Sequence, residues 1–234
     1  MLASAFAAEP TLEELLRATD DAARGEQSVA VMRMDVKTAN YERSMKMQVW
    51  AKGAEKTLVK ILEPAKDAGV ATLKVDDNLW NYLPKVDRTM KVPAGMMSGA
   101  WMGSHFTNGD LVREDRLSED FTCSFSATPA TDPAKNYVIA CVPNPTAAVV
   151  WGKVVAYVRP DLTPVKIEFI DEKGVLVRTI VYGDVRTING RRTPMTMELT
   201  PHDKPGEYTR ITFESLDLDV QLSDDVFTLQ SLKP

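Results

Sequence analysis

Alternation of apolar and polar residues with a period of two is the feature that most constrains this fold. The first such segment spans residues 28–37, and its apolar positions are Ala30, Met32, Met34 and Val36. Residues 41–52 repeat the pattern after the short sequence TANY. Since successive side chains of a strand point to opposite faces, the two segments predict a β-hairpin with one buried face.

Further strand-like runs follow along most of the chain, separated by turn sequences rich in Gly, Pro, Asn and Asp. We predict a mainly β (α+β) fold in which a single curved antiparallel sheet of about 11 strands forms a half-barrel or open barrel. A plain two-sheet sandwich is the alternative. No linker divides the chain, so residues 9–234 are expected to form one domain.

One helix precedes the strands, over residues 10–24. Thr11 and Glu14 have the spacing of a capping box, and Gly25 is expected to end the helix. The apolar stripe at helical spacing consists of Leu12, Leu15, Leu16, Thr19 and Ala23. This stripe needs a surface to cover, and the sheet supplies one.

Residues 93–112 (PAGMMSGAWMGSHFTNGDLV) combine apolar side chains with four glycines. The segment is too apolar for an ordinary surface loop and too rich in glycine for an ordinary helix. We expect it to form a helical or loop flap over a concave apolar surface, with the glycines as hinges. Its apolar side chains are Met96, Met97, Trp101, Met102 and Phe106.

Methionines also occur in pairs two residues apart on three predicted strands: Met32 and Met34, Met45 and Met47, and Met195 and Met197. Methionine is flexible and suits surfaces that must fit variable apolar partners. These pairs and the apolar flap residues are therefore predicted to line a lipid-binding cavity. The alternative is that the methionines only fill the core between sheet and helix.

The cysteines, Cys123 and Cys141, lie in two strand-like runs on either side of a turn near Asp132. Both are nine residues from that position, so a hairpin would place them opposite each other. They are a possible disulfide, which would fit a compartment outside the cytosol, or a pair of buried free thiols.

The N-terminal sequence MLASAFAA resembles the end of a secretory leader, but it lacks a basic region and a long apolar core. Residues 1–8 are accordingly either the remnant of a signal peptide or disordered. A net charge of -5 with scattered Lys and Arg argues against nucleic acid as a partner. No apolar run approaches the roughly 20 residues of a membrane span.

The sequence carries few groups that could do chemistry. Ser104, His105 and Asp110 are close along the chain, but no Gly-x-Ser-x-Gly elbow surrounds the serine. Neither zinc-ligand spacings nor phosphate-binding glycine motifs are present. We therefore predict a protein that is not an enzyme, with no catalytic residues, no metal site and no cofactor.

Four long blocks resemble the LolA-like outer-membrane lipoprotein-sorting proteins. The most distinctive is MMSGAWMGSHFTNGDLV at 96–112, where His105 replaces the Asp of the family motif MGSDFT. The others are LEPAKDAGVATLK at 62–74, LWNYLPKVDRTMKV at 79–92 and AAVVWGKVVAYV at 147–158. The resemblance implies a half-barrel covered by helices and loops around a hydrophobic cavity.

The resemblance also implies a function. It predicts a periplasmic, exported carrier that binds lipoprotein acyl chains or other lipids and moves them between the inner and outer membrane, with transient membrane contact. An inner-membrane transporter of the resistance-nodulation-division type is a possible protein partner. The alternative function is an accessory protein of such a transporter, with the flap as its contact surface.

Overall fold

The computed structural model describes residues 9–22, 26–112, 116–147, 149–218 and 220–233. These residues form one antiparallel sheet of 13 strands. The strands are β1 Gln27–Lys37, β2 Glu42–Lys52, β3 Lys56–Glu63, β4 Ala71–Val75, β5 Asn78–Leu83, β6 Arg88–Lys91, β7 Phe121–Ala127, β8 Tyr137–Pro143, β9 Lys153–Val158, β10 Pro164–Ile170, β11 Leu176–Ile188, β12 Arg191–Pro201 and β13 Tyr208–Leu218.

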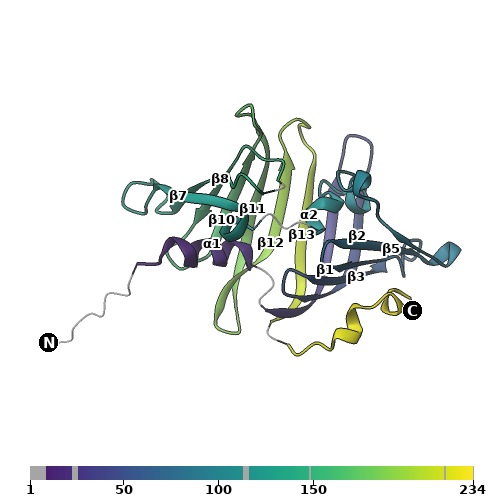
Figure 1. The fold of residues 1–234 in the computed structure, drawn as a ribbon. Helices are drawn as coiled ribbons and strands as arrows, with labels where there is room; N and C mark the ends of the chain where they lie inside the picture. The colour runs from purple at the N-terminus through teal and green to yellow at the C-terminus, as the bar shows by residue number, and fades with distance from the viewer. Residues whose placement is uncertain (1–8, 23–25, 113–115, 148, 219, 234) are drawn as a thin grey trace.

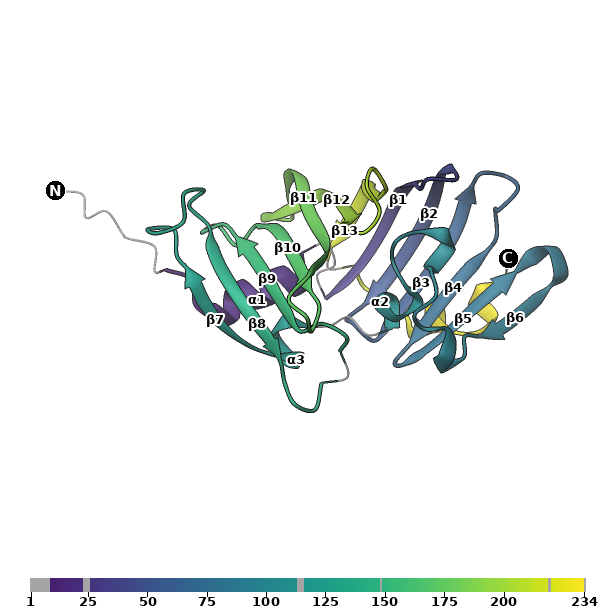
Figure 2. The same cartoon turned by 90° about the horizontal axis from the view of Figure 1, so that it is seen from above.

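The strands follow the order β6-β5-β4-β3-β2-β1-β13-β12-β11-β10-β9-β8-β7. The first and last strands of the sequence, β1 and β13, are therefore neighbours in the middle of the sheet (Figure 1). β6 and β7 lie at its opposite ends (Figure 2). Seen from above, the sheet is a continuous open arc (Figure 2). The prediction of a single curved antiparallel sheet is confirmed, and the sandwich alternative is wrong.

The predicted number of about 11 strands is too low by two. Two of the 13 strands, β4 and β6, have only five and four residues. Both coincide with strand-like runs of the sequence, residues 69–76 and 88–92, so the difference lies in the total and not in a strand that the sequence hides.

The helices are short. α-Helices occupy α1 Leu12–Asp20, α2 Asn108–Val112 and α3 Leu117–Asp120, and 3-10 helices occupy η1 Pro84–Val86, η2 Ala94–Met96, η3 Trp101–Gly103, η4 Asp224–Phe227 and η5 Gln230–Leu232. No helix among the described residues has the length and apolarity that crossing a membrane requires.

The capping box that starts α1 is present, with Glu14 N–H donating to Thr11 Oγ1 and Thr11 N–H donating to the Glu14 carboxylate. The helix ends at Asp20, earlier than the predicted Arg24. The Asp20 carboxylate instead accepts hydrogen bonds from the start of α3, which fixes this end of the helix against another segment. The predicted stop at Gly25, like the prediction for residues 1–8, lies outside the described residues.

One face of the sheet, here called the inner face, carries two separate cores. Leu15 and Leu16 of α1 pack with Leu117 of α3 over strands β7 to β12. On the other half of the sheet, Trp101 packs onto the methionines of β1 and β2. The strand register places Met32 opposite Met47 and Met34 opposite Met45, which explains why the methionine pairs form one continuous layer.

The opposite, outer face of β2 to β5 is covered by the C-terminal segment. Phe227 and Leu232 pack there on Leu58, Leu73 and neighbouring aromatic side chains. The C-terminal segment contains two 3-10 turns, η4 and η5. It closes the outer face rather than the inner one.

Candidate functional site

A cavity of about 290 Å³ lies on the inner face and is lined by residues of both cores. Its floor is formed by side chains of the central strands, among them Met32, Val59, Phe169, Ile180 and Phe213. Its cover is formed by Thr19 of α1, Phe106 and Leu111 of residues 93–112, and Leu117 of α3. The lining is mostly apolar.

The volume of this cavity is close to the lower limit of ligand-binding pockets, which span about 300–1,000 Å³. A pocket of this size suits one slender ligand better than several chains at once. A larger ligand would require its cover to move away from the sheet.

The flap, residues 93–112, folds into a compact unit of its own. Ala100 and Thr107 form a β-bridge, and Trp101 N–H donates to Phe106 O at 2.8 Å. The turn between them requires Gly103, which has a left-handed φ of +71° and packs so close to Tyr41 that an added Cβ would lie 3.0 Å from the phenol oxygen. The loop is therefore a defined structure rather than an irregular connection.

The flap is attached to strands on the β2–β5 half of the sheet. Trp101 Nε1 donates to Thr72 Oγ1 of β4 at 3.2 Å, and the Trp101 side chain is buried. Arg43 Nη1 of β2 donates to Met102 O at 3.2 Å. The Tyr41 hydroxyl donates to Gly103 O.

His105 attaches the flap to the central strand β13. Its Nδ1 and its backbone N–H both contact Thr209 Oγ1, at 2.8 and 3.0 Å, and its Nε2 lies 2.8 Å from Glu207 Oε2. The hydrogen bond from His105, together with one from the Ala39 N–H, holds the pKa of Glu207 below its ordinary value. Ser104 contacts a different group, since its hydroxyl donates to Trp101 O at 2.7 Å.

Asp110 attaches the flap to β11, on the far side of the cavity. Its carboxylate accepts two hydrogen bonds from Arg178, from Nη1 at 2.9 Å and from Nη2 at 2.7 Å. Asp110 also forms a capping box with Thr107 at the start of α2. Burial raises the pKa of Asp110, but the Arg178 hydrogen bonds and charge, with Thr107, outweigh it and hold the pKa below its ordinary value.

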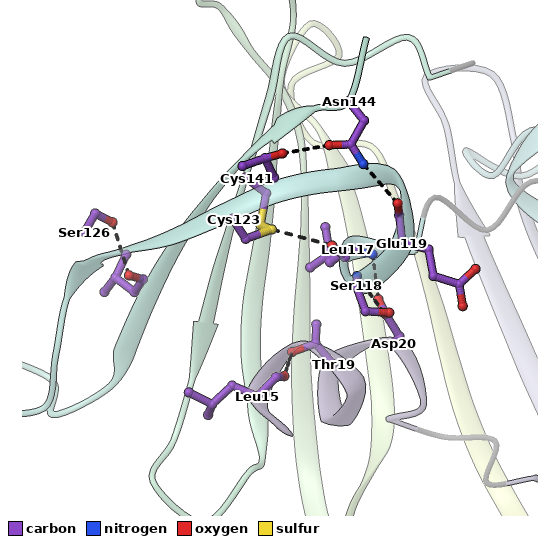
Figure 3. The surroundings of a disulfide bond; sticks show 12 residues. Leu15, Thr19, Asp20, Leu117, Ser118, Glu119, Cys123, Ser126, Cys141 and Asn144 are labelled. Atoms are coloured by element: carbon purple, nitrogen blue, oxygen red, sulfur yellow. Dashed lines mark hydrogen bonds between the residues drawn. A yellow bond between two sulfur atoms is a disulfide. The ribbon is translucent and has the colours of Figure 1, made fainter. Parts of the chain in front are cut away.

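The second part of the cover, α1 and α3, is held by Asp20. Its carboxylate accepts hydrogen bonds from Leu117 N–H at 2.9 Å, Ser118 N–H at 3.1 Å and Ser118 Oγ at 2.6 Å (Figure 3). Burial raises the pKa of this carboxyl, and the Ser118 hydrogen bonds offset the shift only in part.

Cys123 and Cys141 lie directly opposite each other in the β7–β8 hairpin. Their sulfur atoms form a disulfide at the edge of the sheet, beside the α1–α3 cover (Figure 3). Such a bond is typical of proteins that fold in an oxidising compartment.

The predicted lipid-binding residues fall into three groups. Four of them line the cavity: Met32, Trp101, Phe106 and Met197. Met34, Met45 and Met47 are fully buried beneath the flap, in the same core as Trp101.

The remaining predicted residues are not among those that line the cavity. Met195 is buried with Leu216 and Leu218, Met97 and Met102 are partly buried, and Met96 is 62% exposed. A lipid-binding role stays a prediction for the residues of all three groups.

Sequence reasoning did not single out Arg178, although a signal was present. Arg178, Ile180 and Tyr182 alternate on the inner face of β11, and all three line the cavity. An arginine at an inward position of a strand, two residues before an apolar one, marks a polar feature in a mostly apolar wall, which Asp20 and Arg116 also line at the α1–α3 side. Among the described residues, no three or more His, Cys, Asp or Glu side chains form a group that could hold a metal ion.

These features define a class of protein: an open antiparallel half-barrel whose inner face encloses an apolar cavity beneath a flap. A family model described as "Uncharacterized protein" matches residues 53–234, and the chain belongs to that family. Comparison with curated protein sequences gives no match.

Solved structures share the whole fold. A DUF1329 family protein from Desulfovibrio piger is similar with a TM-score of 0.81 and 21% identity over 94% of this chain and 97% of that one. A putative outer membrane lipoprotein-sorting protein domain from Vibrio parahaemolyticus has a TM-score of 0.79 and 23% identity, covering 95% and 98%. A LolA superfamily protein from Nitrosomonas europaea has a TM-score of 0.75 and 24% identity, covering 95% and 99%. The resemblance to LolA-like proteins is confirmed at the level of the fold.

Proposed function

We propose that this protein is a periplasmic carrier that binds lipoprotein acyl chains or other lipids in its cavity and moves them between the inner and outer membrane. The observation that supports the proposal most is the apolar cavity between the two cores, which the flap covers in part. The similar Vibrio parahaemolyticus structure is described as a putative outer membrane lipoprotein-sorting protein domain, which is in keeping with this role. The disulfide is in keeping with an exported protein.

Physical chemistry explains why such a carrier needs a movable cover. Each buried methylene contributes about 0.8 kcal/mol, so ten of them contribute about 8 kcal/mol of gross binding free energy. A chain held this way leaves slowly unless the cavity opens. Besides the packing of Trp101 on the methionines of β1 and β2, the flap is attached through hydrogen bonds and the Asp110–Arg178 ion pair, which can exchange with water as it lifts.

The direct test is lipid analysis of protein purified from the periplasm after export. Mass spectrometry of the extracted protein should detect acyl-chain lipids in a fixed ratio to protein. Ala30→Trp, which places an indole at a buried cavity position, should remove them. Val175→Trp, at a residue that is 57% exposed, is the matched control and should retain them.

An empty wild-type protein that also fails to bind a fluorescent fatty acid would contradict the carrier function. Movement between membranes needs its own measurement. Donor vesicles loaded with the recovered lipid should lose it to acceptor vesicles faster when the wild-type protein is present than when Ala30→Trp is.

A further inference from the structure

Arg178 places a permanent positive charge in the wall of the cavity. Only 9% of this residue is exposed, and a guanidinium group stays protonated at any physiological pH. Its Cζ atom lies 4.6 Å from the ring centre of Trp151 and 4.5 Å from that of Phe169. Both rings favour the cation electrostatically and fix its position.

A cavity that binds only hydrocarbon chains gains no binding free energy from this charge. Removing an arginine and an aspartate from water costs free energy that their mutual attraction does not always restore, and apolar residues of similar size often serve stability as well. The pair in the wall therefore points to a ligand that carries a polar or charged group.

The closed site does not satisfy the whole guanidinium group. Nη1 and Nη2 donate to Asp110, but Nε is buried and, within the described part of the chain, has no acceptor. Asp110 is also the only carboxylate among the described residues within ion-pair distance of Arg178. A further oxygen atom at this position would find an available donor.

Asp110 belongs to the flap, whereas Arg178 belongs to the sheet. When the flap lifts, the ion pair breaks and Arg178 stays behind in the cavity wall without a counter-charge. A neutral ligand that holds the flap away from the sheet leaves this cation without a counter-charge in the cavity wall, which is costly. An anionic group on the ligand can take the place of the Asp110 carboxylate.

We propose that the cavity selects amphiphiles with an acidic head group, a carboxylate or a phosphate, which binds Arg178 in exchange for Asp110. The acyl chain extends from there over the apolar floor beside Ile180 and Phe213. This inference rests on the proposed carrier function and adds the chemical class of the ligand. Arg178 is then the residue that determines head-group specificity.

The test is competition against a fluorescent fatty acid at neutral pH, with dodecanoate, dodecyl phosphate and dodecanol as competitors. Wild-type protein should bind at least one of the two anions about tenfold or more tighter than the alcohol, since hydrogen bonds to charged groups are the stronger ones. The anion that competes better identifies the head group.

Variants then assign the preference to Arg178. Asp110→Asn/Arg178→Met removes both charges together, so no unpaired ion stays in the wall, and it should bind the anions and dodecanol within about twofold of each other. Arg186→Met, at an exposed position of the same strand, is the matched control and should keep the wild-type preference. Asp110→Asn alone should strengthen anion binding, because it removes the competing carboxylate.

Two outcomes overturn the head-group assignment while the carrier function stands: wild type binding dodecanol as tightly as both anions, or the double variant retaining the preference. If none of the three compounds displaces the probe from the wild-type protein, or if the wild-type protein never binds the probe, the carrier function itself is contradicted. Circular dichroism of the double variant is needed to show that it is folded.

Discussion

Asp110 in the flap and Arg178 in β11 form a two-point ion pair, with both carboxylate oxygens within 2.9 Å of guanidinium nitrogens. Two further contacts attach the same flap elsewhere, from Trp101 to Thr72 in β4 and from His105 to Thr209 in β13. These three strands lie in different parts of the sheet order. The flap therefore spans the cavity and joins both halves of the half-barrel.

The ion pair makes stability depend on pH in acid. Because the folded state holds the pKa of Asp110 below its ordinary value of 3.8, the pair contributes fully above that pH. The contribution is lost as the pH falls through 3.8 and then through the lower pKa of the folded state. Asp110→Asn should cost about 3–5 kcal/mol near pH 7, since it leaves Arg178 buried and unpaired.

Denaturant unfolding of the wild type and Asp110→Asn between neutral and acid pH measures this effect, and the difference between the two proteins should shrink as the pH falls. Asp184→Asn removes the partner of exposed Arg186 and should cost only about 0–1 kcal/mol. A difference between wild type and Asp110→Asn that stays constant with pH would show that the ion pair does not carry the effect.

The disulfide should stabilise the edge of the sheet. Its two cysteines are 18 residues apart, and closing a loop of that length contributes about 3 kcal/mol in the chain-entropy account. We expect reductant to lower the free energy of unfolding by this order. A double variant, Cys123→Ser/Cys141→Ser, should match the reduced protein and be insensitive to reductant. Unchanged stability on reduction, with both thiols shown to be free, would rule this contribution out.

Gly152, just before β9, should not tolerate a side chain. An added Cβ would lie 2.6 Å from Asp171 O and 2.7 Å from Glu172 Cα, both backbone atoms that cannot move aside on their own. Gly152→Ala should therefore destabilise the protein by on the order of 1–3 kcal/mol. At Gly95 in the flap, no atom of the described residues beyond its chain neighbours lies within 4 Å of the added Cβ, so Gly95→Ala should change stability by less than about 0.5 kcal/mol. Equal melting temperatures for the two variants would contradict the close packing at Gly152.

Substitutions at Met32 and Met34 should have different effects, one on ligand binding and the other on stability. Met34 is fully buried beneath the flap, so Met34→Ala should cost about 2–5 kcal/mol of unfolding free energy. Met32 lines the cavity, so Met32→Trp should weaken fatty-acid binding by occupying the space. Val86→Ala, at a position that is 65% exposed and outside the cavity lining, should alter neither property. Calorimetry and a fluorescence titration measure the two effects, and full fatty-acid affinity in a folded Met32→Trp protein would count against Met32 as a lining residue.

The sequence predicts the sheet well because the alternation that marks a strand involves only residues that are close together in the chain. Alternation in residues 28–37 and 41–52 assigns the inner face, and the register follows from the short turn between them. The distance of Cys123 and Cys141 from a common turn places them opposite each other in the same way. Each of these predictions needs only neighbouring residues and the geometry of a strand.

The cavity is less predictable because it depends on contacts between distant segments. Met32 and Met34 share one face of one strand, yet only Met32 lines the cavity, because the flap covers Met34 from sixty or so residues further along the chain. Arg178 has its role only through Asp110, which lies in that same distant segment. No local pattern pairs these two residues.

The most direct test of the central claim is photolabelling with a fatty acid that carries a diazirine near the end of its chain. After irradiation of the bound complex, peptide mass spectrometry should locate the label on residues that line the cavity, such as Met32, Ile180 and Phe213. Ala30→Trp should abolish the label there. Label confined to exposed apolar residues such as Val142 and Phe125, unchanged in Ala30→Trp, would contradict an acyl-chain-binding cavity.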